Sequence, residues 1–94
     1  MRQIERTKAF KRDFKKILYV PKHKNIEALL RPVLELLCFD KPLPHKNFDH
    51  ALTGAWKDHR DCHIKPDLIL IYRKVNEEVL QLVRLGSHSE LGLC

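Results

Sequence analysis

The sequence predicts an α+β fold in which two N-terminal helices pack on one face of a small twisted antiparallel sheet. Apolar side chains recur at helical spacing in the first forty residues. Three strand-like segments then follow one another, separated by turns of two or three residues. Strands joined by such short turns run antiparallel, and helices that precede them pack on one sheet face. At 94 residues, the chain is expected to form one domain over 1–94.

The first quarter of the chain is expected to form a strand and a helix. Residues 2–6 are expected to be a short edge strand, followed by a helix over 8–19. Thr7 is a suitable N-cap, because its side-chain oxygen can accept a backbone N–H of the first turn. Four apolar side chains fall at i, i+4, i+7 and i+8, which gives this helix one core-facing stripe. Pro21 is expected to end the helix.

A second helix is expected over 26–39, because its apolar residues also recur at helical spacing. Asn25 precedes it at a position where it can act as an N-cap. Pro32 predicts a kink or a break, since an interior proline removes a backbone hydrogen bond at a cost of about 3 kcal/mol. Residues 40–54 contain two prolines and a glycine and are expected to form an irregular connection.

The three strands are expected over 56–64, 68–74 and 78–85. The middle strand is an apolar run, and the other two alternate between apolar and polar residues. Successive side chains of a strand point to opposite faces. In the first strand, the set expected to face the core is Trp56, Asp58, Arg60, Cys62 and Ile64. The titratable set expected on the open face is Lys57, His59, Asp61 and His63.

The net charge of +6 is concentrated at the N-terminus. Residues 1–24 hold nine Lys or Arg and two acidic residues, a net charge of +7, and the remaining seventy residues carry −1. A one-sided basic block fits a polyanionic partner, either a nucleic acid or an acidic protein. The alternative is a solvated helix face without a partner.

The cysteines and the apolar segments indicate the cellular compartment in which the protein is expected. Cys38, Cys62 and Cys94 include no C-x-x-C pair, and an odd, scattered set argues for a reducing cytoplasm. The first twenty residues are too charged for a signal peptide. No apolar run approaches membrane-spanning length. We therefore expect a cytoplasmic protein without membrane association.

Titratable residues are expected to gather at one end of the sheet. The turn at Asp67 keeps this residue close to His63, and the antiparallel strands can bring Arg84 and His88 to the same patch. His50 lies in the preceding loop and can close over them. Histidine can serve as either proton carrier near neutral pH, and arginine binds phosphate oxygens. These residue types suit metal-free RNA cleavage through the 2′-hydroxyl.

A metal site and a plain polar surface are the competing interpretations. His59 and His63 lie on one strand face but about 13 Å apart, too far to share an ion. The sequence contains no H-E-x-x-H motif, and its cysteines are not spaced for zinc. We therefore expect no metal or other cofactor. A histidine-rich strand can also be a solvated face without chemistry.

Two motifs, DHALTGAWKDHRDCHIKPDLILIY at 49–72 and LVRLGSHSEL at 82–91, resemble the YafQ branch of the RelE-type toxins of bacterial toxin–antitoxin systems. The first half of the chain is similar in layout. This resemblance implies a RelE-like fold and a ribosome-dependent endoribonuclease that cuts messenger RNA in the decoding site without metal. It further implies attack by the 2′-hydroxyl, a cyclic or 3′ phosphate product, and a cognate antitoxin that suppresses the toxin in a hetero-oligomer.

The resemblance places the catalytic positions on four residues. His88 is expected to be the general acid, either Asp67 or His63 the base, and His50 a residue that positions the substrate. The order of these roles stays open, because coupled titratable groups do not reveal which one carries the proton. The residues expected to contact phosphate or RNA, or to border that contact, are Arg84, Asp61, Lys57, Arg60, Lys11 and Lys15.

The chain departs from the family pattern near its C-terminus. An aromatic residue follows S-H-x-x-L in the family, whereas Gly92 stands at this position here. Two alternatives therefore stay open: a module that occupies the ribosome or RNA without cutting, and a structural protein with a charged sheet face. Binding alone needs Lys and Arg, so the set of paired His and Asp favours an enzyme.

Overall fold

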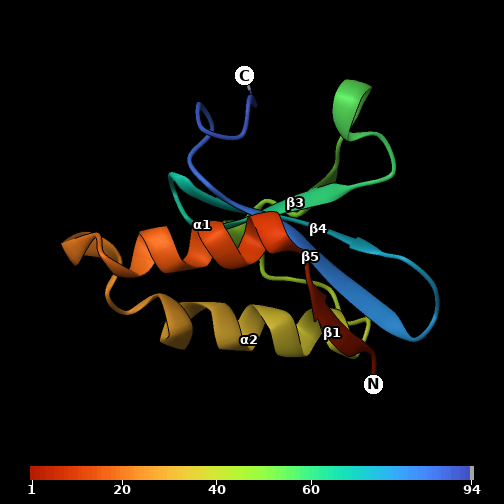
Figure 1. Cartoon of the computed structure of the whole chain (residues 1–94). Coiled ribbons are helices and arrows are strands. Elements are labelled where there is room, and N and C mark those ends of the chain that lie inside the picture. Colours follow the sequence, from red (N-terminus) through yellow and green to blue (C-terminus); the bar gives the residue numbers. More distant parts are fainter. Residues whose placement is uncertain (94) are drawn as a thin grey trace.

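Two helices pack on one face of a five-stranded sheet in the computed structural model, which describes residues 1–93 (Figure 1). Cys94 lies outside the described residues. The helices are α1 (Lys8–Leu18) and α2 (Ile26–Cys38). The strands are β1 (Gln3–Arg6), β2 (His50–Ala51), β3 (Arg60–Lys65), β4 (Leu68–Lys74) and β5 (Val79–Gly86). The predicted α+β class is confirmed. None of the described helices is both long and apolar enough to span a bilayer.

The sheet has the order β1-β5-β4-β3-β2. Strands β2 to β5 pair antiparallel, as their short connections predict. Strand β1 is the expected edge strand, but it runs parallel to β5, from Gln3 opposite Val79 to Arg6 opposite Leu82. The sheet is therefore mixed at one edge. No turn joins β1 to its neighbour, so the connection does not fix its direction.

Helix α1 matches its prediction closely. The Thr7 side chain accepts a hydrogen bond from the backbone N–H of Phe10 at 3.0 Å, which confirms the N-cap. Phe10 and Ile17 are buried against the sheet. The helix ends at Leu18, and Pro21 opens a separate 3₁₀ turn over Pro21–His23.

Helix α2 runs through Pro32 without a break. The proline lies on the exposed side of the helix, so its ring displaces no core side chain. Buried apolar residues on the opposite side, including Ile26, Val33 and Leu37, hold the helix against the core. Asn25 occupies the N-cap position, but its side chain makes no capping hydrogen bond. Packing therefore outweighs the missing backbone bond at the proline.

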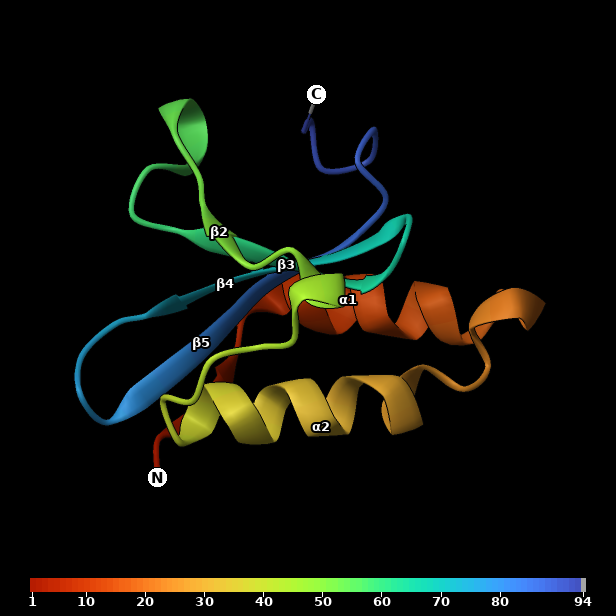
Figure 2. The same cartoon turned by 180° about the vertical axis from the view of Figure 1, so that it is seen from behind.

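The sheet face opposite the helices is partly covered. Figure 2 shows the loop between β2 and β3 and the C-terminal segment rising on that side. A small apolar cluster lies beneath them, built from Ile69, Ile71 and Leu91 with Leu52, Trp56, Val83 and Leu93 packed against it. The prediction of an entirely free face is therefore wrong.

Strand β3 begins at Arg60, not at residue 56. Gly54 and Asp58 have φ values of 66° and 69°, and residues 54–56 form a 3₁₀ turn. The alternation of side chains between the two sheet faces therefore begins at Arg60 and does not include residues 56–59. Trp56 packs on the face opposite to the predicted one, whereas Cys62 is buried in the main core as expected.

Candidate active site

Three histidines and two aspartates converge where β2, β3, the β3–β4 turn and the C-terminal segment meet. His50 lies opposite Asp61 in the pairing of β2 with β3. His63 is two residues further along β3, and Asp67 lies in the turn before β4. His88 follows β5 and contacts Asp67. The structure thus brings together the four residues at which catalysis was expected.

His88 and Asp67 form an oriented pair. Nδ1 of His88 lies 3.2 Å from Oδ1 of Asp67, and the backbone N–H of His88 donates to the same oxygen at 3.4 Å. These hydrogen bonds lower the pKa of Asp67 below its ordinary value, so the carboxylate is ionised and can only accept. Nδ1 must then carry a proton, which leaves Nε2 of His88 available for exchange with a substrate.

His50 and Asp61 form a second pair with a different geometry. Nδ1 of His50 lies 2.7 Å from the carbonyl oxygen of Phe48 and 3.1 Å from Oδ1 of Asp61. A carbonyl can only accept, so Nδ1 donates to Phe48 and Nε2 keeps its lone pair in the neutral ring. Within residues 1–93, Oδ1 of Asp61 has no hydrogen-bond partner. The attraction between His50 and Asp61 is therefore electrostatic.

Asp61 is buried, not part of an open row of charges. Only 3% of it is exposed, beneath His50. Burial raises the pKa of its carboxyl group, and the nearby His50, His63 and His88 oppose that shift. A buried acid is unsuited to touching RNA phosphates. Asp61 therefore lies on the predicted sheet face, next to His50 of β2, but it is buried there and not exposed.

His63 lies between two other rings. Its centroid is 5.2 Å from that of His88, with the ring planes inclined at 65°. On the other side it is 5.4 Å from the ring of Phe48, inclined at 57°. Asn47, which is buried, donates from Nδ2 to the carbonyl oxygen of His63 at 2.7 Å and fixes the loop to β3. Phe48 is not among the predicted site residues, and its one signal in the sequence is its place two residues before His50.

Arg84 lies beside this cluster but is held by helix α1. Its Nε and Nη2 donate to the Asp13 carboxylate at 2.6 and 3.2 Å, and these bonds raise the pKa of the guanidinium. The backbone N–H of Leu85 donates to the same carboxylate at 3.0 Å. Arg84 and Asp67 line one cavity of about 480 Å³. The arginine is thus near the predicted patch, with two of its three guanidinium nitrogens bound to Asp13.

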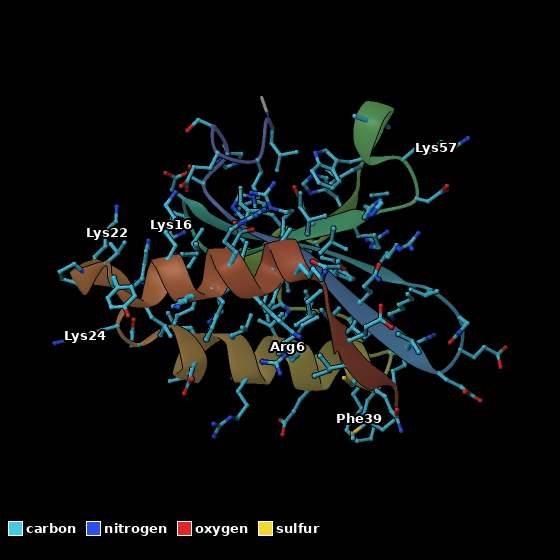
Figure 3. All side chains as sticks on the ribbon, in the orientation of Figure 1. Arg6, Lys16, Lys22, Lys24, Phe39 and Lys57 are labelled. Atoms are coloured by element: carbon cyan, nitrogen blue, oxygen red, sulfur yellow. The ribbon has the colours of Figure 1, made fainter. Side chains whose placement is uncertain are left out.

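The other expected RNA contacts are spread over several elements of the fold. Lys57 projects outward from the tip of the β2–β3 loop (Figure 3). Nε of Arg60 is 3.3 Å from Oδ1 of Asp49. Lys11 and Lys15 are exposed on α1, in the helix layer. The structure therefore provides no single surface that joins these four cations to the catalytic residues.

No metal centre is evident in the part of the chain that the structure describes. Among residues 1–93, no group of three or more His, Cys, Asp and Glu is placed to hold an ion. The histidines instead contact an aspartate, a carbonyl group and one another's rings. Such contacts fix proton positions, which suits acid–base chemistry.

A sequence model of the family described as the bacterial toxin YafQ of type II toxin–antitoxin systems matches residues 2–92. The chain belongs to this family. The mRNA interferase toxin YafQ of Escherichia coli K12 is 38% identical over 90 residues, which cover 96% of this chain and 95% of that protein.

Solved structures of YafQ-like toxins share the fold. A copper-bound mutant toxin from Helicobacter pylori superposes with a TM-score of 0.87 and 43% identity, covering 97% of this chain and 99% of that one. YafQ in the Escherichia coli DinJ–YafQ complex gives a TM-score of 0.78 and 38% identity, covering 97% and 98%.

Gly92 stands where the resemblance to the family predicts an aromatic residue. Gly92 has a φ of 72°, in the left-handed region that bulky side chains avoid. Its backbone N–H donates to the carbonyl of Ser89 at 3.2 Å, and this turn closes the segment that carries His88. An added Cβ would meet no atom within 4 Å. An aromatic residue at 92 would therefore have space but a strained backbone.

Proposed function

We propose that this chain is the toxin of a bacterial type II toxin–antitoxin system and a ribosome-dependent endoribonuclease that cleaves messenger RNA in the decoding site without metal. The observation that carries the proposal is the His88–Asp67 pair beside His63 and His50. The similarity to the mRNA interferase YafQ of Escherichia coli over almost the whole chain supports it. Action on ribosomes places the protein in the cytoplasm.

His88 is proposed as the general acid. Asp67 fixes the proton on Nδ1 and stabilises the imidazolium, from which Nε2 can protonate the leaving 5′-oxygen. Because both hydrogen bonds from His88 end on Asp67, this carboxylate acts through His88 as a positioning residue. The geometry thus favours a base other than Asp67.

His50 is proposed as the base that takes the proton of the 2′-hydroxyl. The carbonyl of Phe48 fixes its tautomer, so Nε2 can accept a proton. The buried Asp61 carboxylate, 3.1 Å away, then offsets the new positive charge. His63 lies between the acid and the base and is proposed to face the phosphate as charge builds on it.

The proposed protein partner is a cognate antitoxin, as in the DinJ–YafQ complex of Escherichia coli. Residues 1–24, with a net charge of +7, suit either an acidic antitoxin segment or ribosomal RNA. The two partners can bind this surface in turn.

Primer extension in a purified translation reaction tests the nuclease. Wild type is compared with and without ribosomes, with EDTA added after ribosome assembly, and with His88→Ala. Cleavage is expected to be codon-phased, to need ribosomes, to survive the chelator, and to fall about 100-fold or more in the variant. Sucrose gradients confirm that the ribosomes stay intact. Stalled ribosomes on uncut messenger would instead indicate a binder without catalysis.

A messenger with sulfur replacing the 5′-bridging oxygen at the cut separates acid from base. A thiolate leaves without protonation, so this substrate needs no general acid. His88→Ala should recover most of its activity on it, whereas His50→Ala should stay slow. Recovery by His50→Ala instead would exchange the two roles.

A further inference from the structure

Phe48 is a large apolar side chain at the margin of the proposed active site. It is 65% exposed and lies two residues before His50, the first residue of β2. Exposure of one phenylalanine means little by itself, because folded proteins expose much apolar surface. The position of this ring is more informative, since its centroid lies 5.4 Å from that of His63.

The backbone at Phe48 adopts a conformation that bulky residues avoid. Its φ and ψ are 45° and 46°, in the left-handed region. The surrounding bonds hold it there: its N–H donates to the carbonyl of His45 at 3.1 Å, and its own carbonyl accepts from His50. Asn47 anchors the preceding residue to β3. Strain that is held in this way occurs at functional sites more often than elsewhere.

Phe48 also separates two hollows in the surface. One, of about 410 Å³, is lined by His63, Lys65 and Pro66. The other, of about 610 Å³, is lined by Pro42, Pro44 and neighbouring residues. The side chain of Lys46 borders both. An open aromatic ring thus adjoins a histidine of the site, with lysines at the rim.

We propose that Phe48 is a stacking platform for an RNA base next to the scissile phosphate, and that the hollow beside His63 receives this nucleotide. Single-stranded RNA is commonly recognised by stacking unpaired bases on aromatic side chains, with cations along the backbone. The carbonyl of Phe48 also orients His50. Phe48 would therefore hold the nucleobase with its ring and, with its carbonyl, orient the imidazole that takes the proton of the 2′-hydroxyl. This inference rests on the proposed nuclease function.

The first experiment measures single-turnover cleavage of ribosome-bound messenger by Phe48→Ala, Phe48→Leu and Phe48→Trp. The alanine and leucine variants are expected to lose about 10-fold or more, the effect of removing one base–aromatic stack. The tryptophan variant should stay within about 3-fold of wild type. Phe39→Ala is the matched control: Phe39 is 55% exposed but lies beyond the end of α2, near β1 (Figure 3). It should cleave like wild type.

A second experiment separates stacking from a purely structural role. Messengers carry one abasic residue, either 5′ or 3′ of the cut. At one of these positions, wild type should slow as much as Phe48→Ala slows on the normal messenger. Phe48→Ala should lose nothing more there, because the same interaction has already been removed. Thermal unfolding of each variant shows that the fold is retained, and Phe48→Leu keeps the size of the side chain without its ring.

Each outcome decides the question. Rates of Phe48→Ala equal to those of Phe39→Ala would overturn the stacking role and leave the nuclease intact. Independent, multiplicative effects of the variant and the abasic residue would also overturn it. Normal cleavage combined with escape from the antitoxin would assign Phe48 to a protein interface instead. If wild type cuts nothing, the proposed function itself is wrong, and the stacking role is lost with it.

Discussion

Asp61 is the residue at which stability and activity are expected to conflict. Its carboxyl group is buried beside His50, and burial raises its pKa above the unfolded value of about 3.9. Folding therefore favours the protonated form of Asp61. The contribution of this form to the free energy of unfolding is fully present below the unfolded pKa. It is lost as the pH rises through the folded pKa. Asp61→Asn mimics the neutral form and should unfold at higher denaturant than wild type at pH 7.

The same substitution should slow cleavage, by up to about 100-fold, because His50 loses the carboxylate that offsets its charge. Urea unfolding at pH 7 and near pH 3.5 checks the stability part, since the two proteins should converge at the lower pH. Glu77→Gln is the control, an exposed acidic residue in the turn between β4 and β5 that loses its charge in the same way. A variant that is less stable at both pH values would show that Asp61 is mainly structural.

At the residue scale, the sequence predicted which titratable residues gather, but not what surrounds them. His50, His63, Asp67 and His88 meet because short turns and alternation constrain them. The burial of Asp61 depends on β2, a two-residue strand without a pattern of its own. The ion pair between Asp13 and Arg84 was not predicted, because it joins segments that are remote in sequence. The contact between Phe48 and His63 was not predicted either, because Phe48 lies in an irregular loop.

At the element scale, Pro32 is a defect that helix α2 tolerates. It removes one backbone hydrogen bond from an otherwise regular helix and is exposed, so no core packing depends on its ring. Pro32→Ala should raise the free energy of unfolding by about 1–3 kcal/mol. Cleavage should not change, because α2 lies on the sheet face opposite the C-terminal segment that carries His88 (Figure 1).

Urea unfolding measures the gain, and Pro42→Ala serves as the control. Pro42 lies in the irregular connection after α2, where replacing it mainly increases the conformational entropy of the unfolded chain. This control should therefore be neutral or slightly less stable. A less stable Pro32→Ala would mean that the proline favours the geometry of α2 and that the missing hydrogen bond is not what limits stability.

The elements that could be predicted are those with an uninterrupted pattern. Helix α1, the apolar strand β4 and the alternating strand β5 agree with expectation to within about two residues. Strand β3 is shorter than predicted, because the left-handed conformation of Asp58 interrupts the alternation that continues in the sequence. The parallel direction of β1 could not be predicted either, since it depends on how the whole chain returns.

At the scale of the whole molecule, helix α1 and the histidines of the proposed active site belong to different layers, although Lys16 and Lys22 of the basic block line one cavity with Asp67. Residues 8–18 form α1 on one face of the sheet, whereas the β2–β3 loop and the C-terminal segment project from its other face (Figures 1 and 2). The contacts that join these layers include the Asp13–Arg84 pair and the pair between Lys16 and Glu90, at 3.2 Å. Binding to a polyanion and cutting RNA should therefore be separable by mutation.

Reversing two charges on α1 tests that separation. Lys11→Glu with Lys15→Glu should weaken ribosome binding and reduce the slope of log affinity against log salt by about 1.5–2, if each lysine neutralises one phosphate. Arg31→Glu with Lys41→Glu makes the same change in net charge at exposed positions outside the basic block. Equal weakening by both pairs would indicate long-range attraction to total charge. Weakening by the α1 pair alone, with cleavage restored at low salt or at saturating ribosomes, would assign ribosome contact to α1 and chemistry to the opposite face.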